Sequence, residues 1–338
     1  MKIDEFTMKN LPCESCGAIG YKNVLDNQIH DYQLNGKAAT WHYSLRQCTN
    51  CGMGFISPKP SFEILQTFYS SNYGSYTAAT NLEKEATSLK YKLAKFRYAS
   101  TFGSSINNRA ATALGMMSEW LTGKVVSYTL GIPLNLPNDA NILELGYGSG
   151  SWLLIMKQLG FTNLQGYDID ANIENKKKLE TAKIKLHSGC FLDLAPPDNC
   201  FDLIRLEHVL EHLLEPDNIL KELHRILKPG GYLVMSFPSI NAISFSLCPK
   251  HSALRESPRH LYLHTTMSAR NIIARAGFKI INIRIYAVVR QLESVINNIF
   301  KENRIPLTIR GLLLTSPFYN LVNTILKKGE FITVLATK

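Results

Sequence analysis

Three glycines at alternate positions form the part of this 338-residue chain that is best suited to hold a ligand against the backbone. They are Gly146, Gly148 and Gly150. Residues 142–145, which precede them, have the apolar character of a parallel strand covered on both faces. Glycine permits a tight turn and a close ligand, and residues 151–159 predict a helix whose first amides face that ligand. The spacing differs from the dinucleotide-binding fingerprint, because Ser151 occupies its last glycine position.

An acidic residue ends the next predicted strand. Residues 164–168 form a short apolar-rich run that finishes at Asp168. A carboxylate at this point of an α/β fold can accept hydrogen bonds from both hydroxyls of a ribose. The alternative is that Asp168 caps the helix expected from about residue 171, a role that suits Asp170 better. We therefore expect Asp168 to hold a ribose and Ile169 to lie beside it.

Four motifs in this order resemble those of class I S-adenosylmethionine (SAM)-dependent methyltransferases. They are the Glu144-to-Gly150 turn, the strand ending in Asp168, the FDLIRLEHVLEH stretch of 201–212 and the ILKPGG stretch of 226–231. The resemblance implies an α/β, Rossmann-like fold, a seven-stranded and mostly parallel sheet with helices on both faces, and a bound SAM. The cofactor-binding residues that it implies are Glu144, Gly146, Tyr147, Gly148, Gly150, Asp168, Ile169, Cys190, Phe191 and Glu207.

One position departs from that family. After the third predicted strand, residues 184–187, the family usually has Gly-Asp, and its carboxylate accepts a hydrogen bond from the adenine amino group. This chain has Gly189-Cys190 instead. We therefore expect adenine to be recognised by backbone groups near Phe191 and by packing against its ring, with Asp193 as the alternative acceptor.

Two Cys-x-x-Cys pairs near the N-terminus have the spacing of a metal knuckle. They are Cys13 with Cys16 and Cys48 with Cys51, each followed by glycine. Four thiolates suit tetrahedral zinc, and disulfides or an iron–sulfur ligand set are the alternatives. Residues 1–5 lack the apolar run of a signal peptide, so we expect a cytoplasmic, reducing setting and a zinc that folds the module without doing chemistry.

The division into domains follows from composition. We expect a zinc ribbon over 1–60, a helical linker or cap over 61–135, and a SAM-binding domain over 136–338 with a helical insertion at about 290–328. No apolar run is long enough for a transmembrane helix. The apolar segment 305–328 ends in lysines. It is expected to pack on the domain, and the alternative is a peripheral contact with a membrane.

The formal net charge of +10 is spread along the chain. This distribution argues against a nucleic-acid partner and fits an anionic small molecule. Nucleobase amino-methyltransferases usually place an Asn/Asp-Pro-Pro-aromatic motif where this chain has Arg205-Leu-Glu207-His208. A zinc-ribbon RNA methyltransferase and a non-catalytic SAM-fold binding protein are the alternatives. The sequence gives no indication of the oligomeric state.

The N-terminal cysteines and the FYSSNYGSY stretch of 68–76 resemble zinc-containing methyltransferases of sugar and natural-product pathways, over 11–76 and about 140–285. The resemblance implies methylation of a small-molecule or glycan-type acceptor, such as a sugar, a sugar nucleotide or a cell-envelope precursor, at a hydroxyl or a carbon. In those enzymes a histidine in a Glu-His-x-x-Tyr-like stretch is the base. His260 takes its place here and Arg259 replaces the acid. His208 is the second candidate base, and His212 with Glu211 is expected to be structural.

Overall fold

The computed structural model describes residues 12–29, 42–69, 136–158, 160–169, 173–252, 254, 256, 258–286, 326 and 328–338. The expected helical cap therefore lies outside the described residues beyond residue 69, as does Asp170. The same holds for the expected insertion at 290–328, with its apolar segment, apart from residues 326 and 328. None of the helices formed by the described residues is long and apolar enough to span a membrane.

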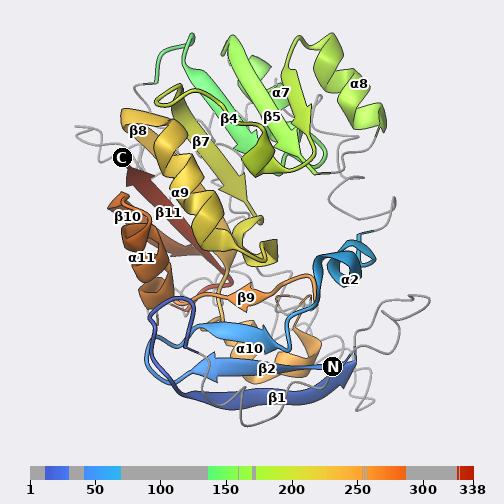
Figure 1. Ribbon diagram of the computed structural model, residues 1–338, viewed down its shortest axis with the longest axis vertical. Helices are drawn as coiled ribbons and strands as arrows, with labels where there is room; N and C mark the ends of the chain where they lie inside the picture. The colour runs from blue at the N-terminus through green and yellow to red at the C-terminus, as the bar shows by residue number, and fades with distance from the viewer. Residues whose placement is uncertain are drawn as a thin grey trace, which may run out of the picture.

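A seven-stranded sheet forms the larger part of the molecule (Figure 1). Its strands are β4 (Asn141–Leu145), β5 (Asn163–Asp168), β6 (Lys185–Ser188), β7 (Phe201–Glu207), β8 (Leu227–Pro238), β10 (Lys279–Tyr286) and β11 (Phe331–Thr337). They lie in the order β10-β11-β8-β7-β4-β5-β6. The five strands from β8 to β6 are parallel, whereas β11 runs antiparallel to both of its neighbours. The expected seven-stranded, mostly parallel sheet is confirmed.

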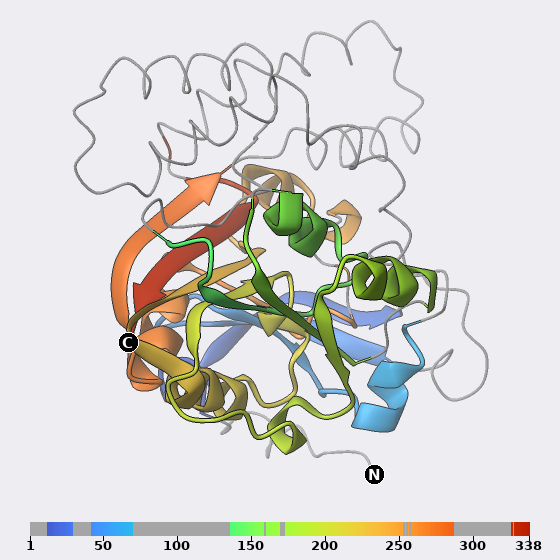
Figure 2. The same cartoon turned by 90° about the horizontal axis from the view of Figure 1, so that it is seen from above.

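Helices cover both faces of this sheet, because its central strands are apolar on both sides. Figure 2 shows α7 (Ser151–Gln158, green) and α9 (Pro216–Ile226, yellow) on opposite sides of the strands. Neighbouring residues of one strand enter different cores, since strand side chains alternate between faces. Ile142 packs with α7 and α8 (Ile173–Thr181), and Leu143 packs with α9 and α11 (Thr266–Arg275).

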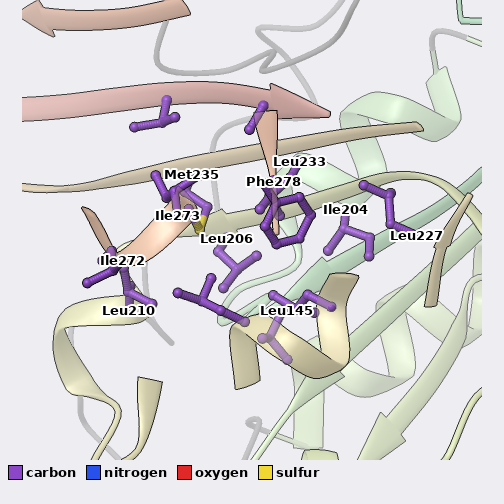
Figure 3. Packing of buried hydrophobic residues seen from close by; sticks show 14 of the residues in the cluster. Leu145, Ile204, Leu206, Leu210, Leu227, Leu233, Met235, Ile272, Ile273 and Phe278 are labelled. Carbon is purple, nitrogen blue, oxygen red and sulfur yellow. The ribbon is translucent and has the colours of Figure 1, made fainter. Parts of the chain in front are cut away.

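The core on the α9 and α11 side is built from long aliphatic side chains. Figure 3 shows Leu206 and Met235 from the sheet meeting Ile272 and Ile273 from α11, and all four are buried. Leu210 joins them from the short 3-10 helix η5 (Leu210–His212), directly after β7. Burial of such a side chain stabilises the fold by about 1.5–3 kcal/mol. This packing therefore fixes the segment that follows β7, where the candidate histidines lie.

A four-stranded antiparallel sheet lies below the larger one in Figure 1, in the order β1-β2-β3-β9. Its strands are β1 (Tyr21–Ile29), β2 (His42–Cys48), β3 (Gly54–Ser57) and β9 (Tyr262–Leu263). The first three fall within the expected zinc ribbon, whereas β9 comes from far along the chain and pairs Leu263 with Gly54. Buried residues of both parts share one core, including Leu45 and Leu261. The small sheet is thus completed by the segment that follows His260.

Candidate active site

The glycine turn after β4 requires glycine at two of its positions. Gly146 has φ +74°, and a Cβ there would lie 2.3 Å from Cγ2 of Val209. Gly150 has φ +72°, and its Cβ would lie 2.4 Å from Leu179. A side chain would be strained at this φ and would also collide with its neighbour. The turn is therefore packed directly against the segment that follows β7.

Asp168, which the sequence predicts to hold a ribose, meets the glycine turn. It is the last residue of β5, is 6% exposed, and accepts a hydrogen bond of 2.8 Å from the backbone N–H of Gly148. Ile169 follows it and is exposed. The side chain of Tyr147 is buried in the core with Leu153, so only its backbone remains in the turn. The carboxylate, the turn and the first residue of α7 thus meet at the carboxyl edge of the sheet, where open α/β sheets bind ligands.

A buried arginine links two of the predicted cofactor residues. Arg205 lies beside Glu144 on the neighbouring strand and forms an ion pair with it. Its other terminal nitrogen donates to Oε2 of Glu207 at 3.1 Å, and its guanidinium lies 4.8 Å from the ring centre of Trp152. Burial raises the pKa of Glu144 to about 7, against the attraction of Arg205. Arg205 was not predicted as a site residue, although a charged residue in an apolar run between Asp202 and Glu207 was a signal in the sequence.

The segment expected to recognise adenine lies after β6. Cys190 is exposed, whereas Phe191 is 4% exposed and begins a short 3-10 helix, η4 (Phe191–Asp193). The ring of Phe191 packs edge-on against Tyr167 with 5.1 Å between centroids. The hydroxyl of Tyr167 donates to the carbonyl of Gly189. This network holds the backbone at 189–191 next to the end of β5.

His208 stands directly after β7, in a backbone conformation that is rare for a non-glycine residue, with φ +54°. Such strain is typical of functional sites. Its Nδ1 lies 3.2 Å from Oε1 of Glu211, and its Nε2 lies 3.7 Å from Oε1 of Glu207. Its ring packs edge-on against Phe331 at 4.7 Å. Although burial disfavours the charged ring, the hydrogen bond to Glu211 raises the pKa of His208.

Glu211 is fully buried among three histidines. Although burial disfavours its charge, the hydrogen bond from His208 and the nearby His212 hold its pKa at about 2. Its backbone carbonyl accepts a hydrogen bond of 2.7 Å from the N–H of Leu261. This bond connects η5 to the loop that carries His260. The carboxylate is therefore ionised and fixed between the two segments that hold the candidate bases.

His212 and His260 face one another across this loop, with 4.9 Å between ring centroids. Nδ1 of His212 lies 3.0 Å from the carbonyl of Arg259 and 3.0 Å from the hydroxyl of Tyr69. Nδ1 of His260 lies 2.7 Å from the carbonyl of Leu254. Burial lowers the pKa of His212 to about 4 and also lowers the pKa of His260. The structure thus brings both predicted bases together with His212, which the sequence suggested only as a structural residue.

The loop around His260 carries a further ion pair. Nε2 of His260 lies 3.3 Å from Oε2 of Glu256, and the other oxygen of Glu256 pairs with Arg259. The pairing partner of Arg259 is therefore a residue of its own loop. His260 is 6% exposed, whereas the side chain of His208 is 27% exposed. Of the two predicted bases, His208 is the more accessible to a substrate.

The four N-terminal cysteines lie together as free thiols. The sulfur atoms of Cys13 and Cys51 are 3.6 Å apart, and those of Cys16 and Cys48 are 3.7 Å apart. A disulfide would need ~2.05 Å. Tetrahedral zinc with sulfur ligands at ~2.3 Å would set them ~3.8 Å apart. The arrangement therefore fits one four-coordinate zinc ion and no disulfide.

The order of the strands, with one antiparallel strand between β8 and β10, defines a class I methyltransferase fold. Residues 117–283 match a methyltransferase domain family. About half of this chain is therefore similar in sequence to a methyltransferase domain, and its described strands have the class I methyltransferase fold.

Curated relatives match only a segment of this chain. A demethylmenaquinone methyltransferase of Bacillus licheniformis is 31% identical over 106 residues, which cover 30% of this chain and 46% of that protein. An uncharacterized methyltransferase of Schizosaccharomyces pombe is 35% identical over 94 residues, 27% of this chain and 32% of that protein. The chain thus spans less than half the length of these relatives.

Solved structures match this chain at low sequence identity. A SAM-dependent methyltransferase from Archaeoglobus fulgidus is 19% identical, with a TM-score of 0.43, and the match covers 72% of this chain and 99% of that one. A phosphoethanolamine N-methyltransferase of Haemonchus contortus in complex with SAM is 14% identical, with a TM-score of 0.42, and the match covers 77% of this chain and 60% of that one.

Proposed function

We propose that this protein transfers a methyl group from SAM to a small-molecule or glycan-type acceptor, at a hydroxyl or a carbon. One contact carries the proposal. Val209, the residue after His208, touches Gly146 of the cofactor turn, so an accessible histidine held by a buried carboxylate lies beside the expected SAM site. When bound, SAM supplies the reactive methyl group on its sulfonium, and the protein has to align the acceptor with it.

At the carboxyl edge of the sheet, both backbone groups and side chains would bind SAM. The backbone at Gly146 and Gly148 would lie against the methionine end of SAM, and Asp168 would accept hydrogen bonds from the ribose. Because the side chain of Phe191 is buried, adenine would meet the edge of the backbone at 189–191. Glu207 accepts a hydrogen bond from Arg205 at the end of β7 and so fixes the arginine side chain below the expected SAM site.

We assign the general base to His208. Glu211 accepts the hydrogen bond from Nδ1–H, which leaves Nε2 as the nitrogen that takes a proton from the acceptor. A buried carboxylate that orients a histidine in this way is the arrangement used by other enzymes for general-base catalysis. His260, which the sequence ranks first, is a weaker candidate for this role because it is buried and its ring lies between Leu254 and Glu256.

We further propose that Cys13, Cys16, Cys48 and Cys51 bind one structural zinc ion. The sulfur–sulfur distances support this, and such a site leaves no coordination position for a substrate. The zinc would stabilise the small sheet and, through β9, the loop that carries His260. Free thiols in this arrangement fit a reducing compartment such as the cytoplasm.

Mass spectrometry of reaction products tests the proposal. The protein is incubated with SAM and separate acceptors, namely sugar nucleotides, cell-envelope glycan precursors, a demethylated quinone and RNA. We expect a mass increase of one methylene group in a sugar or glycan acceptor. His208→Ala should lower turnover by ~10²–10⁴-fold, the usual contribution of a general base, with unchanged SAM affinity. His187→Ala, a half-buried histidine of β6, is the control.

If only the RNA or only the quinone were methylated, the proposed sugar or glycan acceptor would be contradicted. Full turnover by His208→Ala would contradict the assignment of the base while leaving the methyltransferase activity intact.

A further inference from the structure

We propose that Glu211, His212 and His260 form a second metal site, which binds a divalent transition metal beside the proposed base. One possible ligand atom from each residue can be chosen so that all three lie within 4.8 Å of one another. Glu211 and His260 are buried, and His212 is half-buried. The three residues come from two segments, η5 and the loop before β9, which the Leu261-to-Glu211 backbone hydrogen bond holds together.

The carboxylate of Glu211 has an oxygen available for a cation. Its Oε1 lies 3.2 Å from Nδ1 of His208. Its Oε2 is buried and has no hydrogen-bond partner among the residues that the structure describes. A buried polar atom without a partner costs free energy, and a charged one costs more. A bound cation would remove this cost, because it would replace the missing donor.

Both imidazoles make the backbone contact that is common in metal-bound histidines. Nδ1 of His212 lies 3.0 Å from the carbonyl of Arg259, and Nδ1 of His260 lies 2.7 Å from the carbonyl of Leu254. A carbonyl oxygen can only accept, so both Nδ1 atoms carry a proton, and in the neutral rings both Nε2 atoms have a lone pair for a metal. Histidine ligands of metals usually donate their second ring nitrogen to a backbone carbonyl or a carboxylate in this way. Nε2 of His260 lies 4.0 Å from Oε1 of Glu211.

The ligand types select the metal. Two imidazoles and one carboxylate suit Zn²⁺, Fe²⁺ or Mn²⁺, whereas Mg²⁺ and Ca²⁺ prefer oxygen ligands alone. Oε2 of Glu256, 3.3 Å from Nε2 of His260, is placed to become a fourth ligand. Three protein ligands, namely Glu211, His212 and His260, leave at least one coordination position open, unlike the four-cysteine site.

The open position gives the metal a function that rests on the proposed methyl transfer. An acceptor oxygen bound there would lie close to His208, because Glu211 contacts His208 and would also hold the metal. A metal-bound hydroxyl loses its proton more easily than a free one. The metal would thus hold the acceptor and assist the base, and the cofactor turn would hold SAM.

Cobalt titration of the wild-type protein tests the site without any activity measurement. Zinc is removed, Co²⁺ is added, and loosely bound metal is removed by gel filtration before metal analysis. We expect two Co²⁺ ions per chain. One should show the intense charge-transfer absorption of thiolate ligands, and the other should show only the weaker bands of nitrogen and oxygen ligands.

Variants assign the second ion to its ligands. Glu211→Gln, which keeps the size of the side chain, and His212→Ala should each bind one Co²⁺ with the thiolate absorption unchanged. His187→Ala should bind two. The proposal would be overturned if the wild-type protein bound only one Co²⁺ ion and all of the cobalt absorption came from thiolate ligands. This outcome does not depend on whether a variant folds. Retention of the second ion by both Glu211→Gln and His212→Ala would overturn it as well.

Discussion

Replacement of Gly146 by alanine tests how tightly the cofactor turn is packed against the segment after β7. A non-glycine residue at φ +74° costs ~1–2 kcal/mol. The added methyl group would lie 2.3 Å from Cγ2 of Val209, so Val209 or the turn must move, and forcing extra atoms into a packed core costs a further ~1–3 kcal/mol. Gly146→Ala should therefore lower the free energy of unfolding by ~2–5 kcal/mol.

Gly230→Ala is the matched control, because Gly230 has φ +76° and no described atom beyond its own residue and its two chain neighbours lies within 4 Å of its Cβ position. Its free energy of unfolding should fall only by the conformational cost of a side chain at this φ, ~1–2 kcal/mol. Urea denaturation measures both changes, and calorimetry measures SAM affinity, which should fall for Gly146→Ala alone. Equal losses of stability in the two variants would refute the tight contact between Gly146 and Val209.

Two further variants test the buried acid and the proposed zinc. Burial raises the pKa of Glu144 from 4.5 to about 7. Between these two pH values the folded state keeps a proton that the unfolded state has released. The free energy of unfolding therefore falls as the pH rises, and the fall is complete once the pH has passed through 7. Relative to Glu144→Gln, the wild type should lose up to ~3 kcal/mol in unfolding free energy between pH 5 and 8, and parallel profiles would contradict this. Cys13→Ser should lose one zinc ion and lower the melting temperature, yet retain SAM affinity because Asp168 lies in the larger sheet. Atomic absorption and calorimetry measure the two effects, and zinc-free wild-type protein would end the zinc hypothesis.

The larger sheet could be predicted because its strands carry local signals. Buried runs followed by a glycine turn or an acid, as at Asp168, need only a few neighbouring residues to be recognised. The motif of 201–212 did not show where β7 ends, and the strand continues to Glu207. Arg205 has no apolar side chain to mark a strand, and its burial depends on contacts that include an ion pair with Glu144, 61 residues away.

The histidine cluster and the small sheet depend on contacts that sequence spacing does not contain. His208 and His260 could be chosen as candidates from their motifs, but their common partner, Glu211, is brought near His260 by folding. Tyr69 reaches His212 from a segment 143 residues earlier. In the same way, β9 is two residues long and is a strand only because Gly54 and Phe55 of β3 pair with it.

The central claim is that this chain binds SAM through the glycine turn and Asp168. Calorimetric titration of SAM into the wild-type protein, Asp168→Asn and Asp168→Ala tests it most directly. We predict one SAM per chain for the wild type and an affinity weaker by ~1.5–3 kcal/mol for Asp168→Ala, the range for a lost hydrogen bond to a charged group. Asp168→Asn should fall between them, since its amide oxygen can still accept from Gly148. A wild-type protein that binds no SAM, or an Asp168→Ala variant that binds it equally well, would contradict the account.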